Sequence, residues 1–418
     1  MMRNLDRIAI GNDLGNTFCS VPYIDKTEKF VVFDYGESVL PSCVTFEPNY
    51  TVVGNDAYEM RGSHPAQTVY QFKRFMGKRA DDPEFLTRSF AFEVIEGKNG
   101  RARFRMNKNE EMYPEEVSAL VLHYLKSAAE QYSMREVTDA VITVPANFSD
   151  GQKQATMVAA EIAGLKVLRL LNEPTAAALA YAYEQRKSNE VLNVRTALIY
   201  DLGGGTFDVS IVKMENNTET VIVTKGEQWL GGEDFDNSIY EHFVAQLDFD
   251  LTKSDEWLVR QKAVEAKEEL SKRRDSLKKV ILNGNRQVEL SITRDEFDDL
   301  CEHYFLRTKE CIKNAIGDAK KRVSNLIIDD VIVIRGSSRI AYVRNMLKEM
   351  FPGKIRQDVD PDRHCLNDVT PLSMGVAVKN GLFHVIVPAY TSFPCEVTTD
   401  FLNANDGQTS VRLRVSYP

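Results

Sequence analysis

The apolar positions of this chain form segments with helical spacing that alternate with short continuous runs. In residues 114–132 apolar side chains recur every three or four positions, after an opening Pro114, Glu115 and Glu116. Proline fits the first turn of a helix and acidic residues favour its positive end, so this segment is predicted to be a helix. Runs at 140–144 and 167–171 predict buried strands, and residues 152–163 between them predict another helix.

The second half repeats this plan from about residue 193. Strands are predicted within 196–214, at 220–224 and at 331–334, and helices at 235–247 and 257–272. Strands, glycine turns and helices in two matching halves indicate a doubled α/β domain that binds its ligand between the halves.

The last part of the chain has a different pattern. Val411, Leu413 and Val415 alternate with polar residues, as in a half-buried antiparallel strand. Val376, Val378, His384, Ile386 and Val387 indicate similar short strands, so residues 369–418 are predicted to form a partial antiparallel β-domain.

One glycine-rich turn occurs twice, once in each half. Asp13-Leu14-Gly15-Asn16-Thr17-Phe18 and Asp201-Leu202-Gly203-Gly204-Gly205-Thr206-Phe207 both follow an apolar run and precede another. Glycines let backbone N–H groups surround an anion, and a threonine hydroxyl adds a donor. The aspartates suit a metal-bound phosphate better than a bare one. Either copy alone could be an ordinary tight turn, but the repetition favours two hairpins that clamp Mg-nucleotide.

Composition narrows the class of protein. With 418 residues and 43% hydrophobic content, the chain can form two or three domains with real cores. A net charge of -9 argues against binding to nucleic acid or anionic membranes. Six cysteines without a C-x-x-C pair suit reduced thiols and do not indicate zinc. With no membrane-length apolar run and no signal-peptide core, we expect a cytoplasmic or nuclear protein.

Five ordered motifs together resemble the ATPase domain of the seventy-kilodalton heat-shock chaperones, over about residues 8–362. They lie at residues 13–15, 144–148, 172–178, 201–208 and 230–236. Such long motifs are more specific than a single glycine-rich fingerprint, and no Walker-type loop competes with them.

The resemblance implies a two-lobed, actin-like ATPase domain with duplicated β-sheet cores. Lobe I would span residues 1–192 and lobe II residues 193–362, followed by a shortened join at 363–368 and an incomplete peptide-binding β-sandwich at 369–418. It implies slow hydrolysis of ATP to ADP and phosphate with Mg²⁺. Implied partners are unfolded or extended polypeptides, J-domain proteins and nucleotide-exchange factors, with no role for nucleic acid or membranes.

The resemblance also implies roles for individual residues. Lys73 matches the lysine that reaches the γ-phosphate and the in-line water, and phosphoryl transfer depends on such positioning and charge. Glu173 would orient metal-bound water, and Asp201 would hold metal waters and accept a proton. The implied catalytic residues are Lys73, Glu173, Asp201 and Thr206, and the metal-site residues are Asp13, Glu173 and Asp201. The implied nucleotide-binding residues are Gly15, Asn16, Thr17, Phe18, Gly203, Gly204, Gly205, Thr206, Gly231, Gly232, Glu233, Lys267, Ser271, Gly336, Ser337 and Arg339.

Each of these assignments has a simpler alternative. Lys73 could be a surface lysine, and the aspartates could cap turns. Lys267 and Ser271 stand four residues apart, so they share a helix face that could simply be solvated.

Several positions depart from the family pattern. Asn16 replaces a threonine, and Glu268 replaces an arginine that stacks on adenine, which should weaken nucleotide binding. Arg335 replaces the first of two glycines in the adenine loop, where it could crowd the base or supply the missing cation. About 25 or more residues are missing around 363–367, far beyond ordinary variation in a connection.

Three functions therefore compete. The first is a chaperone with a slow ATPase, the second an ATP-binding regulator or remnant, and the third a small-molecule kinase of the same fold. ATP turnover without an added acceptor distinguishes the first from the others, and the short join predicts that ATP and peptide binding are uncoupled.

Overall fold

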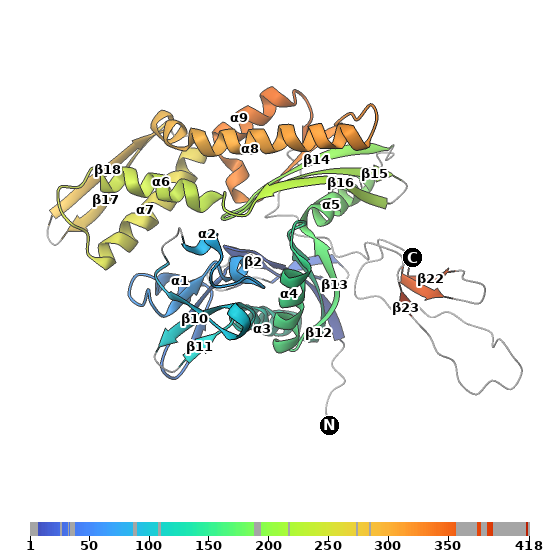
Figure 1. The fold of residues 1–418 in the computed structure, drawn as a ribbon, viewed down its shortest axis with the longest axis horizontal. Coiled ribbons are helices and arrows are strands. Elements are labelled where there is room, and N and C mark those ends of the chain that lie inside the picture. Colours follow the sequence, from blue (N-terminus) through green and yellow to red (C-terminus); the bar gives the residue numbers. More distant parts are fainter. Residues whose placement is uncertain are drawn as a thin grey trace, which may run out of the picture.

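The structure is a computed structural model that describes residues 7–25, 27–31, 33, 38–86, 90–107, 110–187, 194–215, 218–272, 275–283 and 286–356, and three short strands beyond them. Within this part the chain forms two mixed β-sheets, each with its own hydrophobic core and helices (Figure 1). This α/β architecture with duplicated sheets confirms the predicted fold class.

The sheet of the first half has the strand order β13-β12-β1-β2-β5, and β3 and β4 extend it beside β1. Its central strands β1 (Arg7–Leu14), β12 (Glu136–Val144) and β13 (Lys166–Asn172) are parallel. Helices α3 (Pro114–Ser133) and α4 (Asp150–Ile162) pack against each other and against this sheet. The remaining strands are β2 (Phe18–Ser20), β3 (Pro22–Asp25), β4 (Thr27–Phe30) and β5 (Leu40–Pro41).

The sheet of the second half has the order β16-β15-β14-β19-β20. Its strands are β14 (Arg195–Leu202), β15 (Phe207–Glu215), β16 (Thr218–Glu227), β19 (Asp330–Ile334) and β20 (Ile355–Arg356). Ala197 and Ile199 belong to the core beside helix α5 (Glu173–Lys187), whereas Leu198 and Tyr200 belong to the core that includes helix α8 (Arg294–Arg322). Both faces of β14 are therefore buried, which explains its continuous apolar run.

Smaller elements complete the two halves. The first half adds β6 (Cys43–Phe46), β7 (Thr51–Val53), α1 (Asn55–Glu59), β8 (Thr68–Tyr70), η2 (Phe72–Phe75), α2 (Pro83–Leu86), β9 (Glu93–Glu96), η3 (Lys98–Gly100), β10 (Ala102–Asn107) and β11 (Glu110–Met112). The second half adds α6 (Gly232–Val244), α7 (Lys253–Ser271), β17 (Ser276–Asn283), β18 (Arg286–Thr293), η4 (Gly336–Arg339) and α9 (Ala341–Met350).

Most predicted elements are present, with shifted ends. Helices α6 and α7 begin three and four residues before the predicted starts, because Gly231 and Thr252 provide their N-terminal caps. The hairpin β17–β18 and the long helix α8 are additional elements that were not predicted from the sequence.

Beyond residue 356 the structure describes only β21 (Met374–Ala377), β22 (Phe383–Val387) and β23 (Val415–Ser416), which form one antiparallel sheet. The predicted join at 363–368, Val378, Val411 and Leu413 lie outside the described residues, as does the predicted lobe boundary at 192–193. In the part of the chain that is described, no helix has the length and apolar character needed to cross a membrane.

Candidate nucleotide-binding cleft

The first glycine-rich turn joins β1 to β2, with Asp13 paired to Ser20 and Leu14 to Cys19. A Cβ atom on Gly15 would collide with the carbonyl oxygen of Phe18, so this tight turn requires glycine. Beneath the turn, Ser42 Oγ donates a 2.7 Å hydrogen bond to the Gly15 carbonyl and lies 3.0 Å from Cys19 Sγ. Burial raises the pKa of Cys19 to about 12, so its thiol stays protonated and supports the turn.

The second turn joins β14 to β15, with Asp201 paired to Asp208. Gly203 donates its N–H to the Thr206 carbonyl at 3.0 Å, which closes the turn. The carbonyls of Gly203 and Gly204 accept hydrogen bonds from the N–H groups of Gly232 (2.9 Å) and Glu233 (2.7 Å). The first residues of helix α6 therefore hold the second turn, because N–H groups at a helix start lack partners within the helix.

The two turns face each other across the middle of the molecule. A Cβ atom on Gly204 would collide with Thr17 of the first turn, and one on Gly205 would collide with Asn16 and Arg74. The Arg74 guanidinium also donates a short hydrogen bond to the Gly205 carbonyl. Glycine at these two positions therefore permits the close approach of the two halves.

A cleft of about 1780 Å³ opens beside the turns. It is lined by Asp13, Asn16, Thr17, Phe18, Glu173, Gly203, Gly204, Gly205, Thr206, Gly232, Glu233, Lys267, Ser271, Gly336, Ser337 and Arg339, all proposed from the sequence. The other four, Gly15, Gly231, Lys73 and Asp201, stand just behind this lining. Gly231 packs on the backbone of Gly204 and Gly205, and the two charged side chains contact residues of the lining.

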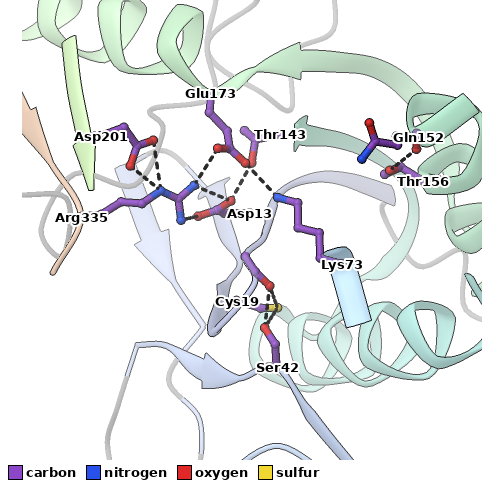
Figure 2. A network of polar contacts seen from close by, with 11 residues as sticks. Asp13, Cys19, Ser42, Lys73, Thr143, Gln152, Thr156, Glu173, Asp201 and Arg335 are labelled. Carbon is purple, nitrogen blue, oxygen red and sulfur yellow. Dashed lines mark hydrogen bonds and ion pairs between the residues drawn. The ribbon is translucent and has the colours of Figure 1, made fainter. Parts of the chain in front are cut away.

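Three carboxylates from three elements converge on one arginine at the floor of the cleft (Figure 2). Arg335 Nη1 lies 3.2 Å from Asp13 Oδ2, Nη2 lies 3.3 Å from Glu173 Oε2, and Nε lies 3.0 Å from Asp201 Oδ1. Lys73 Nζ donates to Glu173 Oε1 at 2.9 Å, so a second cation joins the same network. In this arrangement the charge of Arg335 points to the carboxylates.

The equivalent aspartates of the two turns have opposite pKa shifts. Burial tends to raise the pKa of Asp13, but Arg335, Lys73 and a 2.8 Å hydrogen bond from Thr143 outweigh it and lower that pKa. For Asp201 burial dominates and, despite Arg335, raises the pKa to about 7, with Glu173 adding repulsion. Burial and the neighbouring Asp201 also raise the pKa of Asp208 well above its usual value. Burial opposes the charge of Arg335, but the carboxylates raise its pKa far above the usual value, so it stays a cation.

Glu233 connects the two halves. Its carboxylate accepts a 3.3 Å hydrogen bond from Thr17 Oγ1 and a short one from Gln71, and it lies 3.8 Å from the Arg74 guanidinium. Burial raises the pKa of Glu233, and the nearby Arg74 and Arg61 oppose that rise. In this arrangement Glu233 binds the first half of the chain.

The far side of the cleft holds the remaining predicted residues. Lys267 Nζ contacts Asp236 Oδ2 at 2.7 Å and the Gly232 carbonyl at 3.1 Å, and Ser271 Oγ donates to the Lys267 carbonyl at 2.8 Å. Glu268 also lines the cleft, on the exposed side of α7. The shared helix face predicted for Lys267 and Ser271 therefore faces the cleft.

The carboxylates have the chemistry that Mg²⁺ prefers, but in this arrangement they do not fit it. Their oxygens surround the Arg335 guanidinium, and the described residues contain no group of three His, Cys, Asp or Glu side chains arranged to hold a metal ion.

Sequence reasoning missed several residues of this site. Thr143 binds Asp13, Asn147 Nδ2 donates to Asp208 at 3.2 Å, and Gln71 and Arg74 bind the second half. Asn147 lies within the motif at residues 144–148, so its place in the site could have been predicted from the sequence. Gln71 and Arg74 lie close to Lys73 in sequence. The sequence pattern does not show which side chains near Lys73 face the second half of the chain.

Comparisons with known proteins point to one family. The family model described as Hsp70 protein matches residues 9–365 and again residues 363–418, so the two matches meet at the predicted join. A ribosome-associated molecular chaperone of Eremothecium gossypii is 35% identical over 444 residues, covering 97% of this chain and 72% of that protein. A ribosome-associated molecular chaperone of Saccharomyces cerevisiae has the same identity and coverage. The heat shock cognate HSP70 protein of Trypanosoma brucei brucei is 35% identical over 452 residues, covering 97% of this chain and 66% of that protein.

Proposed function

Because this chain belongs to the Hsp70 family, we propose that it is a molecular chaperone that binds ATP in the cleft between its two glycine-rich turns and hydrolyses it slowly. The observation that carries this proposal is the approach of the two turns, with Lys73 and Asp201 joined through Glu173 and Arg335 behind them. Members of this family are ATPases that bind ATP or ADP with Mg²⁺.

The cleft offers a donor for phosphate. Asn16 is 9% exposed and lines the cleft, and neither polar atom of its amide has a hydrogen-bond partner among the described residues. A buried polar group without a partner is unfavourable, so a phosphate oxygen that accepts from this amide would stabilise the site. The substitution at Asn16 is therefore compatible with nucleotide binding.

Two side chains have environments suited to hydrolysis. Glu173 holds Lys73 in a defined position. A cation that stabilises the developing charge of a phosphoryl group has to be fixed in this way. The raised pKa of Asp201, about 7, lies near the range where a carboxylate can both lose and accept a proton at neutral pH. We assign charge stabilisation to Lys73 and proton acceptance from the attacking water to Asp201.

Lys73→Ala tests this assignment. Single-turnover ATP cleavage should fall about 100- to 1000-fold, while nucleotide affinity changes only a few-fold, because the cation acts chiefly on the transition state. Lys279→Ala is the matched control, since Lys279 is also a poorly exposed, ion-paired lysine (12% against 9% for the Lys73 side chain) and lies outside the cleft. Equal losses of cleavage and affinity in Lys73→Ala would contradict the catalytic role.

A second candidate function is ATP binding without hydrolysis, as in a regulator. The contacts of Arg335 favour it, because they engage both Asp13 and Asp201. Nucleotide binding together with no cleavage by the wild-type chain would establish this alternative and exclude the ATPase. Absence of nucleotide binding would overturn both.

We further propose that the partners are extended polypeptides, J-domain proteins and nucleotide-exchange factors, in the cytoplasm or nucleus. The antiparallel sheet of β21, β22 and β23 supports a polypeptide-binding β-domain. Because the join at 363–368 is too short to supply a closing helix or a leucine-rich linker, we expect ATP turnover to be insensitive to added peptide. A several-fold rise in turnover with an extended apolar peptide would contradict this uncoupling.

A further inference from the structure

Arg335 has a backbone conformation that side chains rarely adopt. Its φ of 68° and ψ of 163° lie in a region populated almost only by glycine. It directly follows β19, whose last residue, Ile334, pairs with Asp201 in the parallel strand β14. The pairing of β19 with β14 thus places this strained residue beside the second glycine-rich turn. Contacts with neighbouring residues must stabilise its strained backbone.

The side chain of Arg335 runs between the two turns. A Cβ atom on Gly203 would lie 3.3 Å from Arg335 Cδ, and one on Gly15 would lie 3.6 Å from Arg335 Nη1. Both glycines therefore leave the space through which the guanidinium reaches the first half. At Gly203 the added atom would be tight against the arginine, whereas at Gly15 it would make an ordinary van der Waals contact with it.

The guanidinium is the common partner of carboxylates from both halves (Figure 2). Asp13 comes from β1, Glu173 from the start of α5 and Asp201 from β14, and each lies 3.0–3.3 Å from a nitrogen of Arg335. Three carboxylates close together repel one another strongly in a buried site, so a cation among them stabilises their charged forms. A divalent metal ion would also meet this need, but it and the guanidinium cannot share the same oxygens.

We propose that Arg335 is a built-in cation of the phosphate site, which takes the place of a divalent metal ion between the turns and lets this protein bind nucleotide without one. This proposal rests on the proposed nucleotide binding. It adds that Arg335 and a metal ion compete for Asp13, Glu173 and Asp201. The positive charge between the two turns then belongs to the chain itself.

The first test measures the affinity of wild-type protein for fluorescent ADP, in EDTA and in excess Mg²⁺. The two dissociation constants should differ by less than about threefold, because Arg335 already supplies the charge. For Arg335→Gly, affinity in EDTA should fall about tenfold or more, and Mg²⁺ should restore it. Arg307→Ala is the control, because Arg307 is ion-paired to Glu227 outside the cleft and should retain the wild-type response.

The second test measures metal binding directly, by electron paramagnetic resonance of Mn²⁺ without nucleotide. Wild-type protein should bind no Mn²⁺ in the cleft, whereas Arg335→Gly should bind it, and Asp13→Asn in the same background should abolish that binding. This readout does not depend on catalysis. If Arg335→Gly fails to fold, Arg335→Lys retains one charge but loses the fork that spans three carboxylates, and it should show intermediate metal dependence.

The outcomes separate this inference from the proposed function. Failure of wild-type protein to bind ADP in either condition would overturn nucleotide binding itself. Wild-type binding that depends on Mg²⁺ by about tenfold or more would retain nucleotide binding and overturn the role of Arg335. Mn²⁺ binding of equal strength to wild type and Arg335→Gly would also overturn it, since the two cations would then not compete.

Discussion

The two glycine-rich turns share the sequence Asp-Leu-Gly and the same place at a strand end, yet their surroundings differ. Asp13 receives the Thr143 hydroxyl and the charges of Lys73 and Arg335, and its pKa is lowered. Asp201 also has Arg335, but burial dominates there, Glu173 adds repulsion, and its pKa is raised to about 7. Repetition of a motif therefore duplicates backbone geometry without duplicating electrostatics, because charged neighbours come from distant parts of the chain.

The two turns are also supported by different means. In the first, the Ser42 hydroxyl binds the Gly15 carbonyl from below, and the glycine avoids a collision inside its own turn. In the second, N–H groups of helix α6 bind the turn carbonyls, and Gly204 avoids a collision with the opposite turn. Substitutions in the first turn should therefore affect folding, and those in the second should affect how the halves meet.

The largest contrast is expected between Gly15→Ala and Gly204→Ala. The added Cβ of Gly15→Ala meets backbone, which cannot move aside, so the free energy of unfolding should fall by about 3 kcal/mol. Gly204→Ala meets the Thr17 side chain, so we expect a loss of about 1 kcal/mol and about tenfold weaker nucleotide binding. Urea unfolding and nucleotide titration measure both effects, and equal unfolding losses would contradict the distinction.

The second contrast is expected between Asp13→Asn and Asp201→Asn. Removing the charge of Asp13 loses favourable contacts, so stability at pH 8 should fall by about 1–2 kcal/mol. Removing the charge of Asp201 relieves burial and repulsion, so stability at pH 8 should rise by about 1–2 kcal/mol. Urea unfolding without nucleotide measures the change in the free energy of unfolding for both variants. Changes of the same sign would show that the two carboxylates have equivalent environments.

The pH dependence should separate the same two aspartates. The folded-state pKa of Asp201 is raised, so its contribution to wild-type stability is lost as pH rises from about 4 to about 7. The gain in Asp201→Asn should therefore grow across that window and be small below it. The folded-state pKa of Asp13 is lowered, so its contribution is lost only as pH falls below its usual value of 3.8. Unfolding curves from pH 4 to 8 that show parallel behaviour of both variants would contradict this.

The smallest effect is expected for Ser42→Ala. This change leaves the Gly15 carbonyl with only the long 4.0 Å contact from Cys19 Sγ and should lower stability by about 1 kcal/mol, with a weakening of nucleotide binding. Ser210→Ala is the matched control, because Ser210 is equally buried but binds the Thr224 hydroxyl between strands of the second half. It should leave nucleotide affinity unchanged. An identical loss of affinity in both variants would show a general effect on folding.

Local signals predicted much of the fold. The proline and glutamates at the start of α3 placed that helix correctly, and apolar runs located β12, β13, β14 and β19. Helix α8 was missed, although Thr293 and Glu296 form a capping box at its start. Its buried residues recur every three or four positions, as in a helix, but they include Thr308, Ala315 and Ala319 and lie along a mostly polar helix. The apolar contrast between its two faces is therefore weak.

By itself the sequence determined the two glycine-rich turns, the α/β class and the residues that gather around one cleft. These properties follow from backbone preferences and apolar spacing, which act over short stretches of chain. Only the tertiary structure decided the partner of each charge. Arg335 lies 322 residues from Asp13 in sequence, and it meets the carboxylates because β19 pairs with β14 and the two halves close on each other. Electrostatic energy depends on distance in space and on burial, and neither quantity is written in the order of residues along the chain.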